Sequence, residues 1–161
     1  SYFVQYLKDK LTIKDSYLNL SEYLNFTGKY DEAKYIHESI GLGTNIKTTP
    51  RDLLVAYNKL YRNNPSVLAV IRQGMKECAY YGTGKLLPEI SGELDLSCKT
   101  GTSYRIKPDG SFDWRNNTGW FLIMYPAEDP VYSFLTIIDA SKSEYAVKEG
   151  SELFKRWISE N

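Results

Sequence analysis

Histidine and cysteine are scarce in this 161-residue sequence, which holds one histidine, His37, and two cysteines, Cys78 and Cys98. One histidine cannot form a histidine cluster, so metal catalysis of that kind is excluded. A Ser-His-Asp or Cys-His mechanism would have to use His37, whose charged neighbours in "YDEAKYIHESI" favour a solvated helix position. The two cysteines lack metal-ligand spacing, and they favour two unpaired thiols, with a single bridge as the alternative.

The sequence also lacks an excess of either charge, because 20 Lys and Arg residues balance 20 Asp and Glu residues. A partner such as nucleic acid or an anionic membrane would call for a basic excess on one face. No apolar run approaches the roughly 18 residues that span a bilayer, and the first residues do not resemble a signal peptide. We expect any membrane anchor to lie in a segment that this chain does not carry.

Helix signals dominate the first half of the chain. The clearest helix is predicted by "TTPRDLLVAYNKLY", in which Thr49 can cap, Pro50 suits the first helical position and Asp52 can reach back as in a capping box. A second helix is predicted to begin at Asn64-Pro65 and to end near "YYGTG", where two glycines interrupt the pattern. Shorter helices are expected within residues 2–11, 16–28 and 31–40.

From residue 94 the hydrophobic pattern becomes strand-like. One strand is predicted by "LDLSCKTG", and a hairpin buried on both faces by "GWFLIMY" and "VYSFLTII". The intervening "YRIKPDGSFDWRNN" is expected to be a polar loop with a Pro-Asp-Gly turn. A covering helix is predicted by "SKSEYAVKEGSELFKRWISE", with Ser141 and Glu144 as a capping box. The sequence therefore predicts one α+β domain, with residues 1–92 mainly helical and residues 93–161 forming three antiparallel strands and a terminal helix.

The strongest candidate for a site is Lys99-Thr100-Gly101-Thr102, which lies within a predicted strand. A lysine on a strand holds a fixed positive charge that can bind a carboxylate or lower the pKa of neighbouring hydroxyls. The hydroxyls of Thr100 and Thr102 point to the same side and can bond a carboxylate. Gly101 lets an extended ligand approach the backbone, so that the Thr102 N–H can donate to an oxyanion. As a bare triplet, the pattern is also typical of an ordinary strand.

Together with its flanking blocks, this motif resembles the penicillin-binding proteins and related serine acyltransferases, which share Ser-x-x-Lys, Ser-x-Asn and Lys-Thr-Gly motifs. The segment "GLGTNIKTTPRDLLVAYNKLYRNN" is similar to the family's helical region upstream of the Lys-Thr-Gly strand. The segment "IRQGMKECAYYGTGKLL" is similar to the one just before that motif, and Arg115 with "GWFLIMYP" is similar to the following strand. The order and spacing of these blocks over residues 41–138 carry the resemblance.

The resemblance implies the C-terminal portion of a serine D,D-transpeptidase domain with a β-lactamase/transpeptidase-like fold. Its substrate would be the D-Ala-D-Ala stem of peptidoglycan, and β-lactam antibiotics would acylate the same serine. Carried over by position, the catalytic candidates are Lys99, which would support proton transfer, and Thr102, whose N–H would form half of an oxyanion hole. The family implies no cofactor and no metal. The substrate-binding candidates are Thr100, Gly101, Ser103 and Tyr104.

The sequence departs from the family in its first two motifs, because no Ser-x-x-Lys occurs and no Ser-x-Asn precedes Lys99. Since "SYFVQYL" resembles the segment directly after Ser-x-Asn in the family, we expect the nucleophile in a missing N-terminal part of the same domain. The expected location is the extracytoplasmic (periplasmic) face of a bacterial cell membrane. Two alternatives stay open: a relative that binds peptidoglycan or senses β-lactams without catalysis, and an aromatic-rich structural module without a site.

Overall fold

The structure is a computed structural model that describes residues 48–63, 65–85 and 94–161. The chain divides into two compact units, residues 1–60 and residues 61–161. The helices expected within residues 2–40, the surroundings of His37 and the helix start at Asn64 lie outside the described residues.

Helix α4 spans Pro50–Asn63 and begins as the sequence predicts. The Thr49 hydroxyl accepts a hydrogen bond from the backbone N–H of Asp52 at 3.1 Å. This bond satisfies one of the first N–H groups of the helix, which have no carbonyl partner within it. Tyr61, near the end of α4, belongs to the second compact unit.

Helix α5 spans Pro65–Tyr80 and ends at the Gly-Thr-Gly sequence, also as predicted. The N–H of Gly82 donates to the Glu77 carbonyl, and the N–H of Gly84 donates to the Cys78 carbonyl, each at 3.0 Å. The Glu77 carbonyl also accepts from the Tyr81 N–H at 2.8 Å, whereas the Cys78 carbonyl would otherwise be one of the unpaired carbonyls at a helix end. The turn after α5 is therefore tied to the end of the helix.

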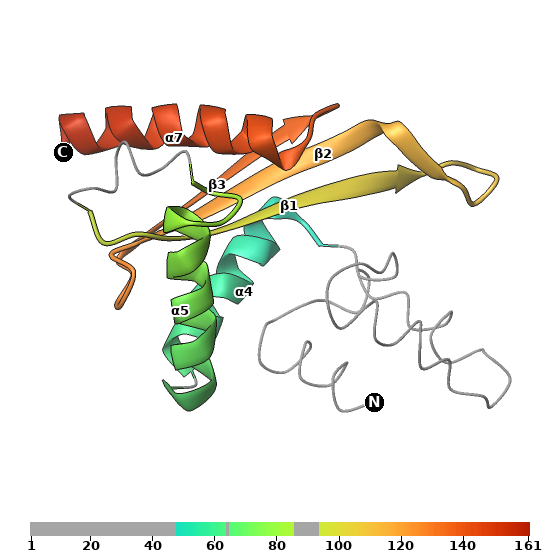
Figure 1. Ribbon diagram of the computed structural model, residues 1–161. Coiled ribbons are helices and arrows are strands. Elements are labelled where there is room, and N and C mark those ends of the chain that lie inside the picture. The colour runs from blue at the N-terminus through green and yellow to red at the C-terminus, as the bar shows by residue number, and fades with distance from the viewer. Residues whose placement is uncertain (1–47, 64, 86–93) are drawn as a thin grey trace, which may run out of the picture. The chain divides into compact units, whose positions relative to one another are not determined.

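Three antiparallel strands form one sheet in the order β1-β2-β3 (Figure 1). Strand β1 spans Ser97–Ile106, β2 spans Phe112–Tyr125 and β3 spans Tyr132–Asp139. Helices followed by an antiparallel sheet and a terminal helix confirm the α+β class. The pairing of β2 with β3 confirms the hairpin that the two apolar runs predict.

The prediction of a polar loop over residues 104–117 is wrong for most of this segment, because β1 extends to Ile106 and β2 begins at Phe112. The pairing of β1 with β2 continues past a register shift after Tyr104 and ends with Ile106 opposite Phe112. The chain reverses over residues 107–111, where Gly110 has a φ of +81°. The polar residues and the Pro-Asp-Gly turn of this segment are typical of a loop, whereas the strand pairing joins residues that are distant in sequence and leaves no local pattern.

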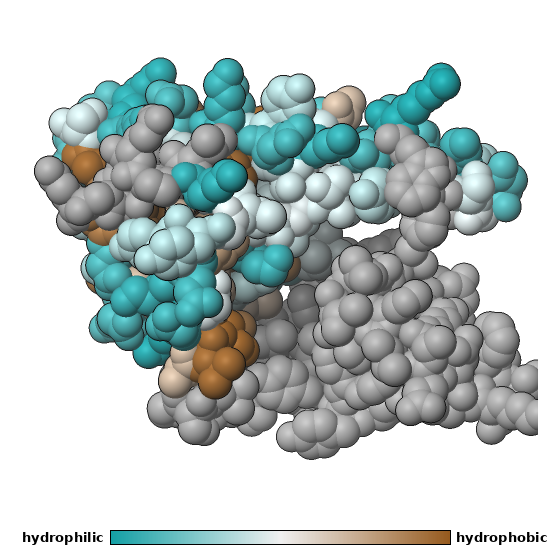
Figure 2. Space-filling view, in the orientation of Figure 1, coloured by the Kyte–Doolittle hydropathy of each residue, from teal (hydrophilic) through white to brown (hydrophobic). Residues whose placement is uncertain are grey.

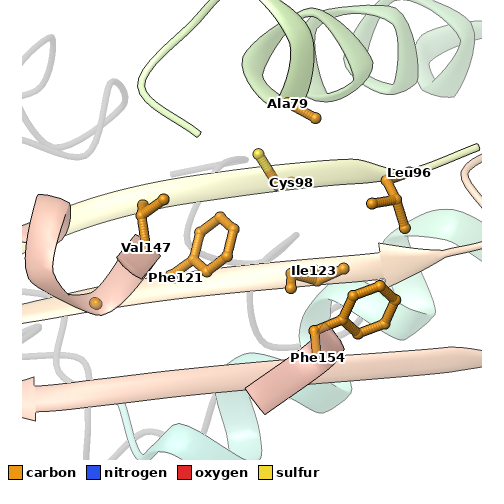
Figure 3. Close-up of a cluster of buried hydrophobic side chains, with 8 residues drawn as sticks. Ala79, Leu96, Cys98, Phe121, Ile123, Val147 and Phe154 are labelled. Carbon is orange, nitrogen blue, oxygen red and sulfur yellow. The ribbon is translucent and has the colours of Figure 1, made fainter. Parts of the chain in front are cut away.

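Helix α7 spans Ser143–Glu160 and lies along one face of the sheet, which confirms the predicted covering helix (Figure 1). Its Val147 and Phe154 are buried against Phe121 and Ile123 of β2 (Figure 3). Burial of each such side chain contributes about 1.5–3 kcal/mol. The remaining buried members of this core are Ala79, Leu96, Cys98 and Ala146.

The capping box expected at the start of α7 is wrong. The N-cap residue is Lys142, which makes no side-chain capping bond, and the Ser141 hydroxyl donates to the Lys142 carbonyl at 3.2 Å. The N–H of Ser143 instead donates to the Thr102 hydroxyl of β1 at 3.1 Å. The start of α7 is thus bonded to the sheet that the helix covers.

Burial differs between the two strands of the hairpin. Residues 121–124 of strand β2 are covered on both faces, as predicted, because Leu122 and Met124 on the face opposite α7 are fully buried like Phe121 and Ile123. Strand β3 departs from the prediction, since Tyr132 is 46% and Ile137 39% exposed. Within the described residues β3 pairs with β2 alone, so its outer side lacks the cover that a central strand has.

Hydrophilic side chains predominate on the outer side of α7 in the space-filling view (Figure 2), where Tyr145 and Leu153 of this helix are also exposed. An apolar stripe toward the sheet and a charged outer side are typical of a helix that packs on one face only. Among the helices that the structure describes, none combines the length and the apolar content needed to cross a bilayer.

Candidate functional site

The site residues that the sequence predicts all lie on β1, and the pleat of the strand divides them between its two faces. Lys99 and Gly101 share the face opposite α7 with Trp120, which lies beside Gly101 in register. Thr100 and Thr102 point to the other face, the one covered by α7. The strand therefore brings the positive charge and the two hydroxyls to neighbouring positions on different faces.

Lys99 is exposed, and two contacts fix where its ammonium group lies. Its Nζ donates to the carbonyl of Thr100 at 2.6 Å, and it lies 5.5 Å from the centre of the Trp120 ring. An ammonium group at this distance from an indole face is attracted by the ring quadrupole. The charge is therefore held beside β1 with part of its surface open to solvent.

Gly101 lies directly under the indole of Trp120. A Cβ atom at position 101 would overlap the ring carbons and nitrogen of that indole. The sequence suggests that position 101 is a glycine because a ligand must approach the backbone there. The structure adds a second reason, because the Trp120 indole occupies the space that a side chain would need. The signal was present in the sequence as a tryptophan on the neighbouring strand, but only the register shows that the two residues are opposite each other.

Thr100 is 7% exposed, and its hydroxyl shares a 2.5 Å hydrogen bond with the hydroxyl of Thr83. Thr83 belongs to the turn after α5, so this bond joins the Gly-Thr-Gly turn to the Lys-Thr-Gly strand. Sequence reasoning missed Thr83 as a neighbour of the site, because the two threonines are 17 residues apart.

Thr102 accepts the bond from the Ser143 N–H in the first turn of α7. A hydroxyl has one O–H donor and two acceptor lone pairs, so this bond leaves the Thr102 O–H free to donate. The partial positive charge at the start of α7 lies on the same side. This arrangement favours a negatively charged group next to Thr102.

The last two candidates lie toward the end of β1. The Ser103 hydroxyl donates to the Thr118 carbonyl of β2 at 3.4 Å, and Tyr104 is 42% exposed. Both residues are exposed.

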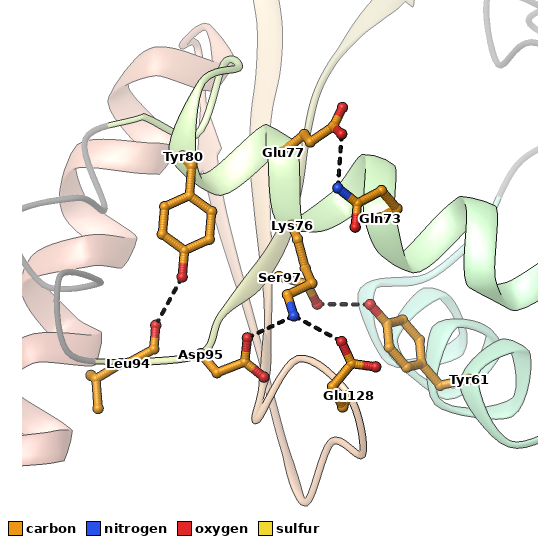
Figure 4. A network of polar contacts seen from close by, with 9 residues as sticks. All are labelled: Tyr61, Gln73, Lys76, Glu77, Tyr80, Leu94, Asp95, Ser97 and Glu128. Carbon is orange, nitrogen blue, oxygen red and sulfur yellow. Dashed lines mark hydrogen bonds and ion pairs between the residues drawn. The ribbon is translucent and has the colours of Figure 1, made fainter.

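A polar network fixes the start of β1 (Figure 4). The ammonium group of Lys76 lies 2.9 Å from an Asp95 oxygen and 2.8 Å from a Glu128 oxygen. Hydrogen bonds to Glu128 and then to Asp95 raise the pKa of Lys76 well above its ordinary value of 10.5. The hydroxyl groups of Tyr61 and Ser97 share a buried 2.7 Å hydrogen bond, and burial raises the pKa of Tyr61. These contacts hold α5 and the end of α4 against the strand that carries Lys99.

The tripeptide Ser159-Glu160-Asn161 has the Ser-x-Asn spacing, but it ends α7 and makes only local bonds. The Ser159 hydroxyl donates to the Arg156 carbonyl, and the Asn161 amide donates to the Trp157 carbonyl. Both side chains close the C-terminal end of their own helix, so this spacing marks no part of the site.

Comparisons with known proteins place the chain in a family. Residues 25–159 match the model of a family described as the penicillin binding protein transpeptidase domain. A solved structure, penicillin-binding protein PBP2 from Helicobacter pylori, is similar with a TM-score of 0.58 and 22% sequence identity. The similarity covers 85% of this chain and 30% of that one, so the chain spans less than a third of the length of this structure. A comparison with curated proteins finds no match.

Proposed function

The chain belongs to the penicillin-binding protein transpeptidase domain family, and from this premise we propose that it supplies the Lys-Thr-Gly wall of a serine D,D-transpeptidase active site. The observation that carries the proposal is the placement of Lys99, Thr100 and Thr102 on an outer strand of the sheet within the described residues. An outer strand offers its backbone to an extended peptide, and its alternate side chains can then recognise that peptide.

In the proposed reaction, a serine hydroxyl attacks the carbonyl of the D-Ala-D-Ala stem of peptidoglycan, and the terminal D-Ala leaves. An amine of a second stem then attacks the acyl-enzyme and forms the cross-link. The sequence of 161 residues contains no Ser-x-x-Lys, so the proposal assigns the nucleophile to another part of the full-length protein. This reaction requires a fixed cation, a carboxylate site and an oxyanion donor next to the peptide.

The residues of β1 meet these requirements in the proposal. The Lys99 ammonium supports proton transfer and attracts the substrate carboxylate, because it is exposed and held beside the strand. The Thr102 hydroxyl donates to the carboxylate, and the Thr102 N–H donates to the oxyanion. Thr100 is proposed to contact the same carboxylate by exchanging its bond to Thr83. Ser103 and Tyr104 line the strand beyond the reacting bond.

The proposed partners are peptidoglycan stem peptides and β-lactam antibiotics, and the proposed location is the extracytoplasmic face of a bacterial membrane. A β-lactam carries a carboxylate next to its reactive amide, so it would use the same Lys99 and Thr102 contacts as the stem peptide. The location follows from the substrate, because peptidoglycan is assembled outside the membrane.

The test is acylation of the full-length protein by a fluorescent penicillin. We expect Lys99→Ala to lower the rate of acylation by roughly 100-fold or more, the usual loss when a group that assists proton transfer is removed. The matched control is Lys148→Ala, which removes an exposed lysine of α7 and should leave the rate unchanged. An unchanged rate in Lys99→Ala would refute the role given to Lys99.

The same experiment distinguishes the enzyme from a binding relative. A covalent acyl-enzyme keeps its label after denaturation, whereas a protein that only binds the penicillin loses it. Retention of the label supports the transpeptidase, and complete loss supports the non-catalytic peptidoglycan-binding or β-lactam-sensing protein.

A further inference from the structure

The two cysteines of the chain, 20 residues apart in sequence, meet beside the Lys-Thr-Gly strand. Cys78 lies in the last turn of α5 and Cys98 immediately precedes Lys99 in β1. Their sulfur atoms are 3.4 Å apart, and both residues are free thiols. In Figure 3 the Cys98 side chain points toward Ala79, the residue after Cys78. The two side chains therefore face each other across the contact between α5 and β1.

The two thiols differ in accessibility. Cys98 is fully buried, and a side chain at Gly84 would overlap its sulfur. Cys78 is only partly buried, so it is the more accessible of the two cysteines. An attacking thiol must be accessible, whereas a thiol that attacks only its neighbour can be buried.

Hydrogen bonds give the two thiols different acidities. The Cys98 thiol donates to the Cys78 sulfur, and this bond outweighs burial and lowers the pKa of Cys78 to about 5. A contact from the Thr83 hydroxyl at 3.7 Å acts in the same direction. The proton stays on Cys98, whose pKa is raised by this bond and by burial. The lowered pKa favours the thiolate of Cys78, which is the nucleophilic form.

We propose that Cys78 and Cys98 form a reactive dithiol that a low-molecular-weight disulfide converts to an intramolecular disulfide, with Cys78 attacking first and Cys98 completing the bridge. The Cys78 sulfur attacks one sulfur of the small disulfide, whose S–S bond breaks and releases one thiol. The Cys98 sulfur then attacks the Cys78 sulfur, loses its proton and releases the second thiol. The two cysteine sulfurs are oxidised and the two sulfurs of the reagent are reduced, so atoms and electrons balance.

Closure needs only a small movement. The sulfurs must approach from 3.4 Å to the bond length of about 2.05 Å. Cys78 lies in the final turn of α5, next to the Gly-Thr-Gly turn. The inference does not rest on the proposed function, because it concerns thiol chemistry that can be measured without a β-lactam or a stem peptide.

The test uses the reduced full-length protein, treated with oxidised glutathione without oxygen, then alkylated and digested with trypsin. Cleavage after Lys76, Lys85 and Lys99 separates the two cysteines into peptides 77–85 and 86–99. We expect these two peptides to be joined by a disulfide, with intact mass showing the loss of two hydrogen atoms and no glutathione retained. A wild-type protein in which Cys78 keeps its glutathione, or reacts with neither partner, would overturn the proposal.

Two variants test the order of attack. Cys98→Ala should accumulate glutathione on Cys78, because the second thiol is missing. Cys78→Ala should leave Cys98 unmodified in the folded protein and modified once urea exposes it. Modification of Cys98 in folded Cys78→Ala at the wild-type rate of Cys78 would contradict the assigned order, and circular dichroism confirms that both variants are folded.

Discussion

At Gly101 and Cys78, the environment of one residue depends on a single neighbouring group from another element. The hydrogen atom of Gly101 leaves room for the Trp120 indole, on which the position of the Lys99 ammonium depends. The hydrogen bond from the Cys98 thiol lowers the pKa of Cys78. Neither relation can be read from the sequence, since both depend on residues from separate elements that only the folded chain brings together.

We expect Gly101→Ala to lower the free energy of unfolding by about 1–3 kcal/mol, because its methyl group would displace the Trp120 indole. Urea denaturation followed by circular dichroism measures the change. The matched control is Gly74→Ala in α5, where nothing lies within 4 Å of the added carbon. This control should raise the stability by about 0.5–1 kcal/mol, the ordinary gain in a helix interior. A gain in Gly101→Ala would show that the indole is not fixed over the glycine.

We expect Cys98→Ala to raise the pKa of Cys78 from about 5 toward the ordinary value, because the main hydrogen bond that stabilises the thiolate is lost. The rate of alkylation by iodoacetamide, measured against pH, reports the thiolate fraction. In the wild type the rate should stay level through neutral pH and fall only near pH 5. In the variant it should fall already below about pH 8. Identical profiles would contradict the assignment of the proton to Cys98.

At the scale of elements, the start of α7 shows where prediction from sequence reaches its limit. The helix itself follows from an apolar stripe that includes Val147 and Phe154, and this stripe is local in sequence. The cap of the helix does not follow from a local pattern. The Thr102 hydroxyl, which accepts the hydrogen bond from the Ser143 N–H, lies 41 residues earlier in the sequence. Likewise, the sequence around Gly110 predicts a loop where the structure has paired strands, because the polar residues of this segment give no strand-like pattern.

We expect Thr102→Val to destabilise the protein by about 1 kcal/mol, the usual cost of losing a capping acceptor. Thr102→Ser keeps the hydroxyl and should retain most of the stability. Urea denaturation of the two variants under the same conditions gives the difference. Equal stability of Thr102→Val and the wild type would show that solvent satisfies the Ser143 N–H equally well.

At the scale of the whole molecule, the sequence predicts the order of elements, the hairpin and the covering helix, since each depends on periodicity within one segment. The polar network around Lys76 could not be predicted, because Asp95 and Glu128 come from segments that meet only in the fold. The same holds for the candidate site. Its motif on β1 could be recognised from the sequence, whereas the neighbours of that motif, Thr83 and Trp120, come from other elements.

The Lys76 network predicts a loss of stability at alkaline pH. The pKa of Lys76 is raised in the folded protein, so its contribution is complete below the unfolded value of 10.5 and declines as the pH rises above it. We expect Lys76→Met to cost about 0.5–1 kcal/mol near neutral pH and less above about pH 11. Urea denaturation of both proteins at the two pH values gives the two differences. A cost that stays constant across this range would exclude the ion pairs as its origin.

The Trp120 indole, which lies over Gly101, is also a fluorescent reporter next to β1. An ammonium group beside an indole affects its fluorescence, so a ligand that draws Lys99 away would change the emission of Trp120. The sequence has only two other tryptophans, Trp114 and Trp157, which can be replaced by phenylalanine. The protein therefore carries its own fluorophore on the strand where ligand binding is proposed, and occupancy could be followed in solution without any added dye.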